Sequence, residues 1–381
     1  MSAKRKILIL IDWYLPGYKA GGPVRSCANM VAHLKDDFDF YVITGNKDYS
    51  DVQPYQGVNM GQWNLLPDGT QVYYLPEAEQ NAAALRKLVR SGQFDAILLN
   101  GVFSRLFTIA PLRFLSREEK KKVILSVRGM LSPQALAIKK LKKRLFLAYA
   151  RLRGLYSGIT FHITDRSEEG QVKKYFGASC KIRLAPNLGR KSAGSGQALK
   201  SKSAQALELV CVARIAPEKN QLFALNVLRG VQQPVILDLY GPVYNPVYWN
   251  ECQGAIKRLP AHISVNYKGA LPENRIYDTL GQYHFLFMPS VSENFGHIIL
   301  ESLTSGTPVI ISDQTPWKGL EAAKAGFDVS LSDPERFRSI IERAALMNAE
   351  EYLLWSQGAS ALAAKFNADP GVVRLNRDLF I

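Results

Sequence analysis

Two glutamates, Glu293 and Glu301, bracket a short loop and a helix start within residues 289–311. This segment reads as a strand end, a loop with Gly296, an amphipathic helix and a second buried strand. Glycine lets the backbone approach a ligand closely, and the free N–H groups of a helix N-terminus favour a phosphate. Glu301 follows His297 by four residues, so both project from one helix face. A carboxylate just beyond a phosphate site can accept hydrogen bonds from ribose, so the segment predicts a nucleotide-sugar site.

At these residues the chain resembles the GT-B glycosyltransferases of family 4, the glycogen-synthase-like or group 1 enzymes. Their signature is two glutamates with seven residues between them, with Phe-Gly after the first and a small-residue turn downstream. Here Phe295 and Gly296 follow Glu293, and residues 306–309 (Gly-Thr-Pro-Val) form the turn. A bare pair of glutamates is common in helices, but the glycine and the following strand make the pattern specific. The alternative is a structural strand–helix unit of an ordinary Rossmann-like domain.

Two cations, Arg214 and Lys219, follow the first strand of the second half of the chain in the run VARIAPEKN. The family carries Gly-Arg-Leu and a later Lys-Gly here, and Ala213 replaces its glycine. Transfer from a nucleotide sugar builds negative charge on the leaving diphosphate, which side chains and helix dipoles must neutralise when no metal does. The resemblance implies that both cations contact the diphosphate and that Glu293 lies near the donor sugar, so these three are the catalytic candidates. The alternative for the two cations is a surface position near a turn.

The resemblance also implies a set of donor-binding residues. Glu301 corresponds to the ribose-binding glutamate, the loop after Glu293 offers backbone amides to the distal phosphate and the sugar, and the segment after Lys268 flanks the base. Nothing in that segment distinguishes uracil from guanine or adenine. The predicted donor-binding residues are Glu301, Asn294, Phe295, Gly296, His297, Ile298, Lys268 and Leu271.

Candidates for the acceptor side lie in the first half of the chain. Gly21 and Gly22 open a helix and either approach a phosphate or the donor sugar or simply form a tight turn. The run SVRGMLSP resembles an Arg-Gly-Met segment of bacterial polysaccharide-assembly members, so Arg128 is expected to bind an acceptor phosphate or the transferring sugar. Asn100 occupies the place where many members carry a histidine, which departs from the family pattern. Trp317 packs either over the cleft or in a core.

Two series of alternating strands and helices predict an α/β fold. Continuous apolar runs at residues 6–11 and 207–212 are typical of buried parallel strands, and short connections predict doubly wound sheets. The resemblance implies the GT-B arrangement, in which two Rossmann-like domains face a central cleft that holds the active site. The predicted boundaries are 1–190 for an acceptor-binding domain, 191–205 for a Gly/Ser-rich linker, 206–354 for a nucleotide-sugar-binding domain and 355–381 for a segment crossing back onto the first domain.

The excess of positive charge lies entirely in the first half of the chain. Of 48 Lys+Arg and 33 Asp+Glu, residues 1–190 hold 30 and 15, which leaves 18 and 18 for the rest. Residues 139–153 carry seven positive charges and no acid, with apolar residues at helical spacing. Such a basic amphipathic helix suits an anionic membrane surface. Nucleic acid and an ordinary solvated face are the alternatives, and we expect no nucleic-acid partner because no known binding module accompanies the charge.

The composition predicts a globular protein of the reducing cytoplasm. Hydrophobic residues make up 47% of the chain, and the four cysteines show no Cys-x-x-Cys spacing. The five histidines are dispersed as well, so we expect no metal and no cofactor. No secretory signal is expected at the start of the chain, and no apolar run reaches the roughly 18 residues of a membrane span. We therefore expect a cytoplasmic protein, peripheral on the inner face of the cell membrane.

The resemblance implies a retaining, metal-independent glycosyltransferase that uses a UDP- or GDP-sugar and a glycan or polyprenyl-linked acceptor in cell-surface polysaccharide biosynthesis. Retention and a front-face mechanism, in which the leaving phosphate takes the acceptor's proton, rest on the resemblance alone. Other readings are a catalytically silent sugar-nucleotide-binding protein, a basic nucleic-acid-binding protein, and a GT-B epimerase or phosphorylase.

Overall fold

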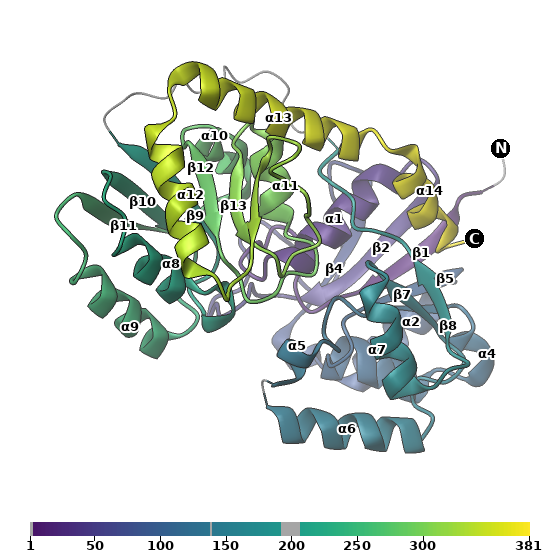
Figure 1. Ribbon diagram of the computed structural model, residues 1–381. Coiled ribbons are helices and arrows are strands. Elements are labelled where there is room, and N and C mark those ends of the chain that lie inside the picture. Colours follow the sequence, from purple (N-terminus) through teal and green to yellow (C-terminus); the bar gives the residue numbers. More distant parts are fainter. Residues whose placement is uncertain (1–2, 138, 192–205) are drawn as a thin grey trace. The chain divides into compact units, whose positions relative to one another are not determined.

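The computed structural model describes residues 3–137, 139–191 and 206–381. The chain divides into two compact units (Figure 1). Unit 1 joins the chain up to Lys191 with Pro370–Ile381, and unit 2 holds the intervening chain as far as Asp369. The predicted linker at 191–205 lies outside the described residues, except for Lys191 itself.

Unit 1 is built on a mostly parallel sheet. Its strands are β1 (Arg5–Leu10), β2 (Phe38–Gly45), β3 (Trp63–Leu65), β4 (Gln71–Leu75), β5 (Ala96–Asn100), β6 (Val123–Ser126), β7 (Thr160–Ile163) and β8 (Lys181–Leu184). Its helices are α1 (Gly22–Leu34), α2 (Ala82–Ser91), α3 (Ala110–Phe114), α4 (Arg117–Lys120), α5 (Pro133–Ala137), α6 (Lys140–Leu152), α7 (Ser167–Phe176) and α14 (Pro370–Asp378), with the short turns η1 (Glu77–Glu79) and η2 (Arg105–Ile109).

The unit 1 sheet has the order β3-β4-β2-β1-β5-β6-β7-β8, and only β3 runs antiparallel to its neighbour. Successive side chains of β1 enter two different cores: Ile7 and Ile9 pack on one face, and Leu8 and Leu10 on the other. A strand buried on both faces has no solvent side, which explains the unbroken apolar run in the sequence. The predicted doubly wound sheet is therefore confirmed for this unit.

Unit 2 repeats the plan with a fully parallel sheet in the order β11-β10-β9-β12-β13-β14. Its strands are β9 (Leu207–Val212), β10 (Val235–Tyr240), β11 (Ile263–Gly269), β12 (Phe285–Met288), β13 (Val309–Ser312) and β14 (Gly326–Val329). Its helices are α8 (Gln221–Leu228), α9 (Pro246–Ile256), α10 (Ile276–Leu280), α11 (His297–Thr304), α12 (Pro334–Leu346) and α13 (Ala349–Asn367), with the turns η3 (Pro217–Lys219) and η4 (Glu273–Arg275).

The C-terminal return begins later than the sequence analysis expected. The predicted segment started at residue 355, but α13 belongs to unit 2, where it packs against α11, and unit 1 resumes at Pro370. Within unit 1, α14 contacts α1, and the Phe380 ring packs on Phe38 with centroids 5.5 Å apart. The Asn376 Nδ2 donates to the Pro186 carbonyl at 2.8 Å. None of the described helices has the length and apolarity needed to span a membrane.

Two helical glycines in unit 2 give matched tests of packing. A Cβ on Gly358 in α13 would lie 2.4 Å from the Lys324 carbonyl oxygen, whereas one on Gly254 in α9 would meet only the Arg258 guanidinium at 3.7 Å. Alanine favours helix over glycine by about 1 kcal/mol, but a clash with fixed backbone costs about 1–3 kcal/mol. We expect Gly358→Ala to lower the free energy of unfolding and Gly254→Ala to raise it, measured by urea denaturation. Equal effects would contradict the close approach of α13.

Candidate active site

The carboxyl edge of the unit 2 sheet brings together the loops that follow β9 and β12. These strands are neighbours, and the chain leaves β9 toward β10 on one side but reaches β12 on the other side. At such a switch point of an open parallel sheet, ligands bind outside the carboxyl ends of the strands. Lys219 follows β9 and Glu293 follows β12, so the strand order itself accounts for their meeting.

Lys219 and Glu293 form a mostly buried ion pair. The Lys219 Nζ lies 2.5 Å from the Glu293 Oε1, and the two side chains are 16% and 11% exposed. The two loops are also joined by their backbones, because the Val291 N–H donates to the Glu218 carbonyl at 3.0 Å. The loop backbone and the ion pair therefore hold the two charges in place together.

Asn220 shapes the turn directly after Lys219. It adopts a left-handed φ of 61° between η3 and α8, and its Nδ2 donates to the Pro289 carbonyl at 3.1 Å. Asparagine tolerates this conformation better than most residues. Asn220 was not among the predicted site residues, although an asparagine just before a helix is a usable signal in the sequence.

The pKa of the Cys211 thiol is affected by the same two charges. Cys211 is buried at the end of β9, and burial raises its pKa to about 12. Lys219 acts to lower that pKa and Glu293 to raise it, so both charges lie close to the strand end. The thiol stays protonated at neutral pH and serves as a packing group.

Arg214 occupies a separate position in the same loop. Its guanidinium pairs with the Glu218 carboxylate at 3.1 Å and lies 5.3 Å from the centre of the Tyr244 ring. Its Nε is buried without a hydrogen-bond partner among the described residues. The two predicted cations thus bind different carboxylates, and the Arg214 guanidinium keeps one N–H donor unused.

Gly296 starts helix α11 in a conformation that suits glycine. Its φ of 74° is left-handed, and a Cβ there would lie 2.6 Å from the Ile299 Cδ1. The helix then begins at His297, so the amides of His297 and Ile298 belong to the first turn, whose N–H groups have no acceptor inside the helix. Glu301 lies one turn further on and is only 9% exposed.

The side chains of this loop mostly serve the core. Phe295 and Ile298 are buried, and the Phe295 carbonyl accepts a hydrogen bond from the Trp317 Nε1 at 2.7 Å. The Phe295 ring meets the His297 ring edge-on at 4.8 Å, and Trp317 packs on Phe366 at 5.2 Å. Trp317, for which the sequence left core and cleft both open, is a core residue. Phe295 and Ile298 can therefore offer a ligand only their backbone.

The predicted base-side residues lie apart from the ion pair, at the end of the edge strand β11. The Lys268 Nζ is 3.4 Å from the Asp238 carboxylate, which also accepts from the Tyr283 hydroxyl at 2.7 Å and the Asn266 Nδ2 at 2.8 Å. Burial raises the pKa of Tyr283, so its hydroxyl remains a donor. Leu271 packs against the neighbouring core. Asp238 was not among the predicted site residues, although an acid inside the apolar strand VILDLY is a visible signal in the sequence.

The predicted donor residues therefore form two groups along one sheet edge. The group at β9 and β12 contains Arg214, Lys219, Glu293, Asn294, Phe295, Gly296, His297, Ile298 and Glu301, and the group at β11 contains Lys268 and Leu271.

Arg128, the acceptor-side candidate, is held by a polar network in unit 1. It follows β6 with a left-handed φ of 54°. Its Nε donates to the Asn100 Oδ1 at 3.0 Å, and its Nη1 donates to the Asn187 side chain. The Glu168 carboxylate accepts from the Gly129 N–H and fixes the next residue. Burial lowers the pKa of Arg128, but an arginine remains charged at neutral pH.

The other acceptor-side candidates reach the same part of unit 1. Gly21 has a φ of 72° and precedes α1, which begins at Gly22, and a Cβ on either glycine would meet no atom within 4 Å. Cys27 on α1 is buried, which raises its pKa, and Arg128 opposes that rise, so the arginine lies beside this helix. The structure thus brings Gly21, Gly22 and Arg128 to one side of unit 1.

Asn100 stands where many family members carry a histidine. Its role here is structural, because it accepts a hydrogen bond from Arg128 and orients that side chain. The buried His162 is bonded on both ring nitrogens, to the Ser126 hydroxyl at 2.7 Å and the Ala185 carbonyl at 2.8 Å. Burial lowers its pKa to about 3, so it is neutral and structural. Among the described residues, no group of three or more His, Cys, Asp or Glu is placed to hold a metal.

Comparisons with known proteins agree with the sequence signature. Residues 199–356 match the model of the family "Glycosyl transferases group 1". No curated protein sequence matches the chain. The match confirms the predicted family for residues 199–356, which include the glutamate signature.

Solved structures resemble the chain over almost its whole length. HepE of Anabaena, solved with UDP and glucose, superposes with a TM-score of 0.72 at 16% identity, covering 98% of both chains. WaaG, a glycosyltransferase involved in lipopolysaccharide biosynthesis, gives 0.69 at 13% identity and 98% of both chains. Sucrose-phosphate synthase of Thermosynechococcus elongatus gives 0.73 at 13% identity and 99% of both chains. The predicted GT-B fold is confirmed.

The different burial of the two cations predicts different effects on stability. Removing one partner of a buried pair leaves an uncompensated charge and costs up to about 3–5 kcal/mol, whereas an exposed pair contributes about 0–1 kcal/mol. The Lys219–Glu293 pair is mostly buried and the Arg214–Glu218 pair is half-exposed. We expect Lys219→Ala to lower the free energy of unfolding by about 2–3 kcal/mol and Arg214→Ala by less than about 1 kcal/mol in urea titrations.

The double variant Lys219→Met/Glu293→Gln should recover part of the loss, because it removes both charges. A Lys219→Ala protein as stable as Arg214→Ala would show that Glu293 is not held by the pair.

Proposed function

We propose that this chain transfers a sugar from a UDP- or GDP-sugar to a glycan acceptor. Its residues 199–356 match the group 1 glycosyltransferase family. The observation that carries the proposal is the Lys219–Glu293 pair at the switch point of unit 2, beside the glycine-started helix α11. HepE, which shares the fold, was solved with UDP and glucose, and this supports a uridine donor.

The cations of unit 2 suit the charge that develops on a leaving diphosphate. An ammonium has three N–H donors, so Lys219 can keep its bond to Glu293 and still donate to a phosphate oxygen. The Arg214 side chain is 35% exposed, so its guanidinium can pair with Glu218 and also donate to an anion. Donors fixed before the reaction stabilise a transition state with little reorganisation. We propose that these two residues, with the amides of α11, neutralise the diphosphate without a metal.

Glu301 and Glu293 have different proposed roles. Glu301 is buried on α11, one turn beyond the proposed phosphate position, and would accept hydrogen bonds from the ribose hydroxyls. Glu293 would orient Lys219 and lie near the donor sugar. We propose retention with a front-face mechanism, in which the leaving phosphate takes the acceptor's proton, and we assign no protein base. This part of the proposal rests on the family resemblance.

On the acceptor side, we propose that unit 1 binds a lipid-linked glycan in cell-surface polysaccharide biosynthesis. Arg128 is fixed by Asn100 and Asn187, so its guanidinium would be preorganised for an acceptor phosphate or for the transferring sugar. WaaG, which shares the fold, takes part in lipopolysaccharide biosynthesis, and this supports the pathway class.

Helix α6 supports a peripheral position on the inner face of the cell membrane. Leu141, Leu145, Tyr149 and Leu152 are between 48% and 85% exposed, and their spacing puts them on one face. The lysines and arginines of the same helix flank this face, and Figure 1 shows α6 at the outer edge of unit 1. Exposed leucines beside cations suit an anionic lipid surface better than a solvated face, which would be polar.

The donor assignment predicts the behaviour of one carboxylate. Losing a charged hydrogen-bond partner costs roughly 1–3 kcal/mol, so Glu301→Ala should weaken UDP or GDP binding by about 5- to 150-fold. The measurement is isothermal titration calorimetry in EDTA, with Glu251→Ala, an exposed glutamate on α9, as the matched control. Unchanged affinity for Glu301→Ala would remove the ribose role. Binding that requires added Mg²⁺ or Mn²⁺ would contradict the metal-free site.

The membrane assignment predicts that apolar contacts matter as well as charge. The variant Leu141→Ser/Leu145→Ser/Leu152→Ser should lose most binding to phosphatidylglycerol vesicles in sedimentation assays, because each inserted leucine contributes about 1.5–3 kcal/mol. Leu346→Ser on α12, also well exposed, is the control and should change nothing. Neutralising Lys139, Lys140, Lys142 and Lys143 should also reduce binding and lower its salt dependence. Vesicle binding equal to that of the unchanged chain in both α6 variants would make α6 an ordinary solvated helix.

A further inference from the structure

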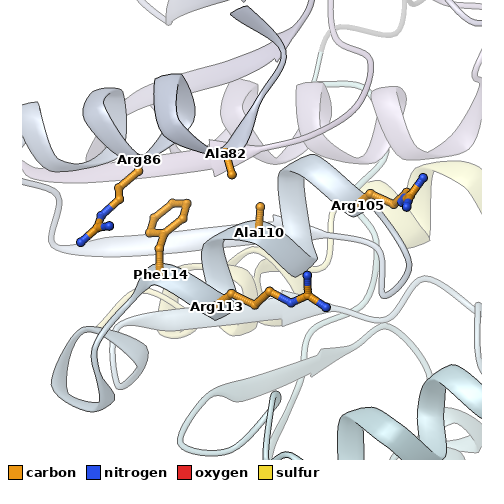
Figure 2. A pocket seen from close by; sticks show the side chains of 6 residues that line it. All are labelled: Ala82, Arg86, Arg105, Ala110, Arg113 and Phe114. Carbon is orange, nitrogen blue, oxygen red and sulfur yellow. The ribbon is translucent and has the colours of Figure 1, made fainter.

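A groove between α2 and the helical segment η2–α3 of unit 1 has no part in the function proposed above. Its volume is about 350 Å³, and Figure 2 shows the side chains that line it. These are Ala82 and Arg86 from α2 and Arg105, Ala110, Arg113 and Phe114 from η2 and α3. Alanines on both walls leave the space open, and the Phe114 ring lies beside Arg86 (Figure 2).

The three arginines of the groove are not neutralised by the protein. Within the described residues, Arg86, Arg105 and Arg113 make no ion pair and no hydrogen bond, whereas Arg336 and Arg343 of unit 2 share the Glu321 carboxylate. The carboxylate that Arg86 influences is Glu119, whose pKa is lowered first by its hydrogen bonds with Ser116 and only slightly by Arg86. Glu119 is occupied as the cap of α4. Arg105 and Arg113 extend toward one end of the groove and Arg86 toward the other (Figure 2), so an anion at the end with Arg105 and Arg113 would be attracted by two unpaired charges.

An unusual turn places Arg105 and Arg113 along the same groove. Residues 105–109 form a π-helix, in which the Ile109 N–H donates to the Ser104 carbonyl at 2.9 Å. In a regular α-helix, eight residues would rotate Arg113 about 80° away from Arg105, and the wider π turn reduces that angle. Such turns are frequent at functional sites.

The π turn is built into its surroundings. The Ser104 hydroxyl accepts from the Phe107 N–H at 3.1 Å and donates to the Asp12 carboxylate at 2.8 Å. The Thr108 hydroxyl donates to the Gly101 carbonyl at 2.6 Å. Two side-chain hydroxyls therefore fix the backbone that carries Arg105, although the guanidinium itself is exposed.

We propose that this groove is a binding site for a phosphate-bearing ligand. The guanidinium fork matches two phosphate oxygens at once, and the two forks of Arg105 and Arg113 at one end of the groove favour a group with more than one negative charge. The apolar wall of Phe114 and the two alanines gives room for a non-polar part of the same ligand. The site is distinct from the donor site of unit 2 and does not depend on the function proposed for that site.

Two sources can supply such a phosphate. Helix α6 packs on Phe103, with the Phe146 ring 6.0 Å away and the Lys143 Nζ 5.3 Å from the ring centre. Phe103 stands two residues before Arg105, so the segment that carries Arg105 also contacts the helix for which we propose lipid contact. A lipid headgroup is one source, and a small soluble phosphate compound is the other.

The test compares two pairs of arginines that carry the same charge. Arg105→Ala/Arg113→Ala removes two groove residues, and Arg90→Ala/Arg117→Ala removes two exposed arginines of α2 and α4 that do not line the groove. Calorimetry with inorganic pyrophosphate probes the soluble source. Sedimentation with phosphatidylglycerol vesicles, against phosphatidylcholine vesicles, probes the lipid source. Both use the full chain, and calorimetry is repeated with Arg214→Ala/Lys219→Ala to remove binding at the proposed donor site.

We expect the groove pair to weaken pyrophosphate or phosphatidylglycerol binding about tenfold or more, and the control pair to leave both unchanged. A loss in the pyrophosphate arm alone identifies a soluble ligand, and a loss in the vesicle arm identifies a headgroup. No loss in either arm, or an equal loss with the control pair, overturns the proposal. Should the alanine pair lose its fold by circular dichroism, Arg105→Lys/Arg113→Lys keeps the charge, removes the fork and must still weaken binding.

A failure of the donor-site proposal would look different. Pyrophosphate binding would then be unchanged by Arg214→Ala/Lys219→Ala, while the effect of the groove pair would persist.

Discussion

The mostly buried pair of Lys219 and Glu293 is the constraint on which the rest of unit 2 depends. Two charges beneath the surface are stable only when each has its partner, so the loops after β9 and β12 must stay at one separation. The backbone bond from Val291 to Glu218 and the turn at Asn220 maintain it. A parallel sheet supplies neighbouring strand ends, and the order of β9 and β12 decides which loops meet there. The strand order of unit 2 therefore determines where this pair of charged groups lies.

Much of the fold and of the candidate site could be predicted from the sequence, because buried parallel strands and the glutamate signature are local patterns. The central strands β1, β5, β9 and β12 are short apolar runs between polar turns and were predictable. The strands β3 and β8 were not, because they lie at the sheet edges and alternate polar and apolar residues over three or four positions. The partners of Arg128 and the network around Asp238 join segments far apart in the chain, and no local pattern carries that information.

The two units differ in how their positively charged side chains are placed. Unit 2 has a nearly balanced composition, and its two candidate site cations, Arg214 and Lys219, are each paired with a carboxylate. Unit 1 holds the excess of positive charge and leaves it exposed on α6 and in the groove of Arg86, Arg105 and Arg113. A cation held by a carboxylate is preorganised for one small ligand. Unpaired cations on a surface attract any anionic partner, and the ionic strength sets the range of that attraction.

The return of α14 to unit 1 has a consequence for how the protein is made. Unit 2 is continuous in the chain, but unit 1 needs residues 370–381, which leave the ribosome after all of unit 2. Before these residues are made, the Phe38 and Phe40 rings lack the contact with Phe380 that they have in the folded protein. The first-made domain is thus completed last, and a nascent chain carries an uncovered aromatic surface for most of its synthesis. A chain cut before residue 370 would leave the Phe38 and Phe40 rings uncovered, although all of unit 2 would be present.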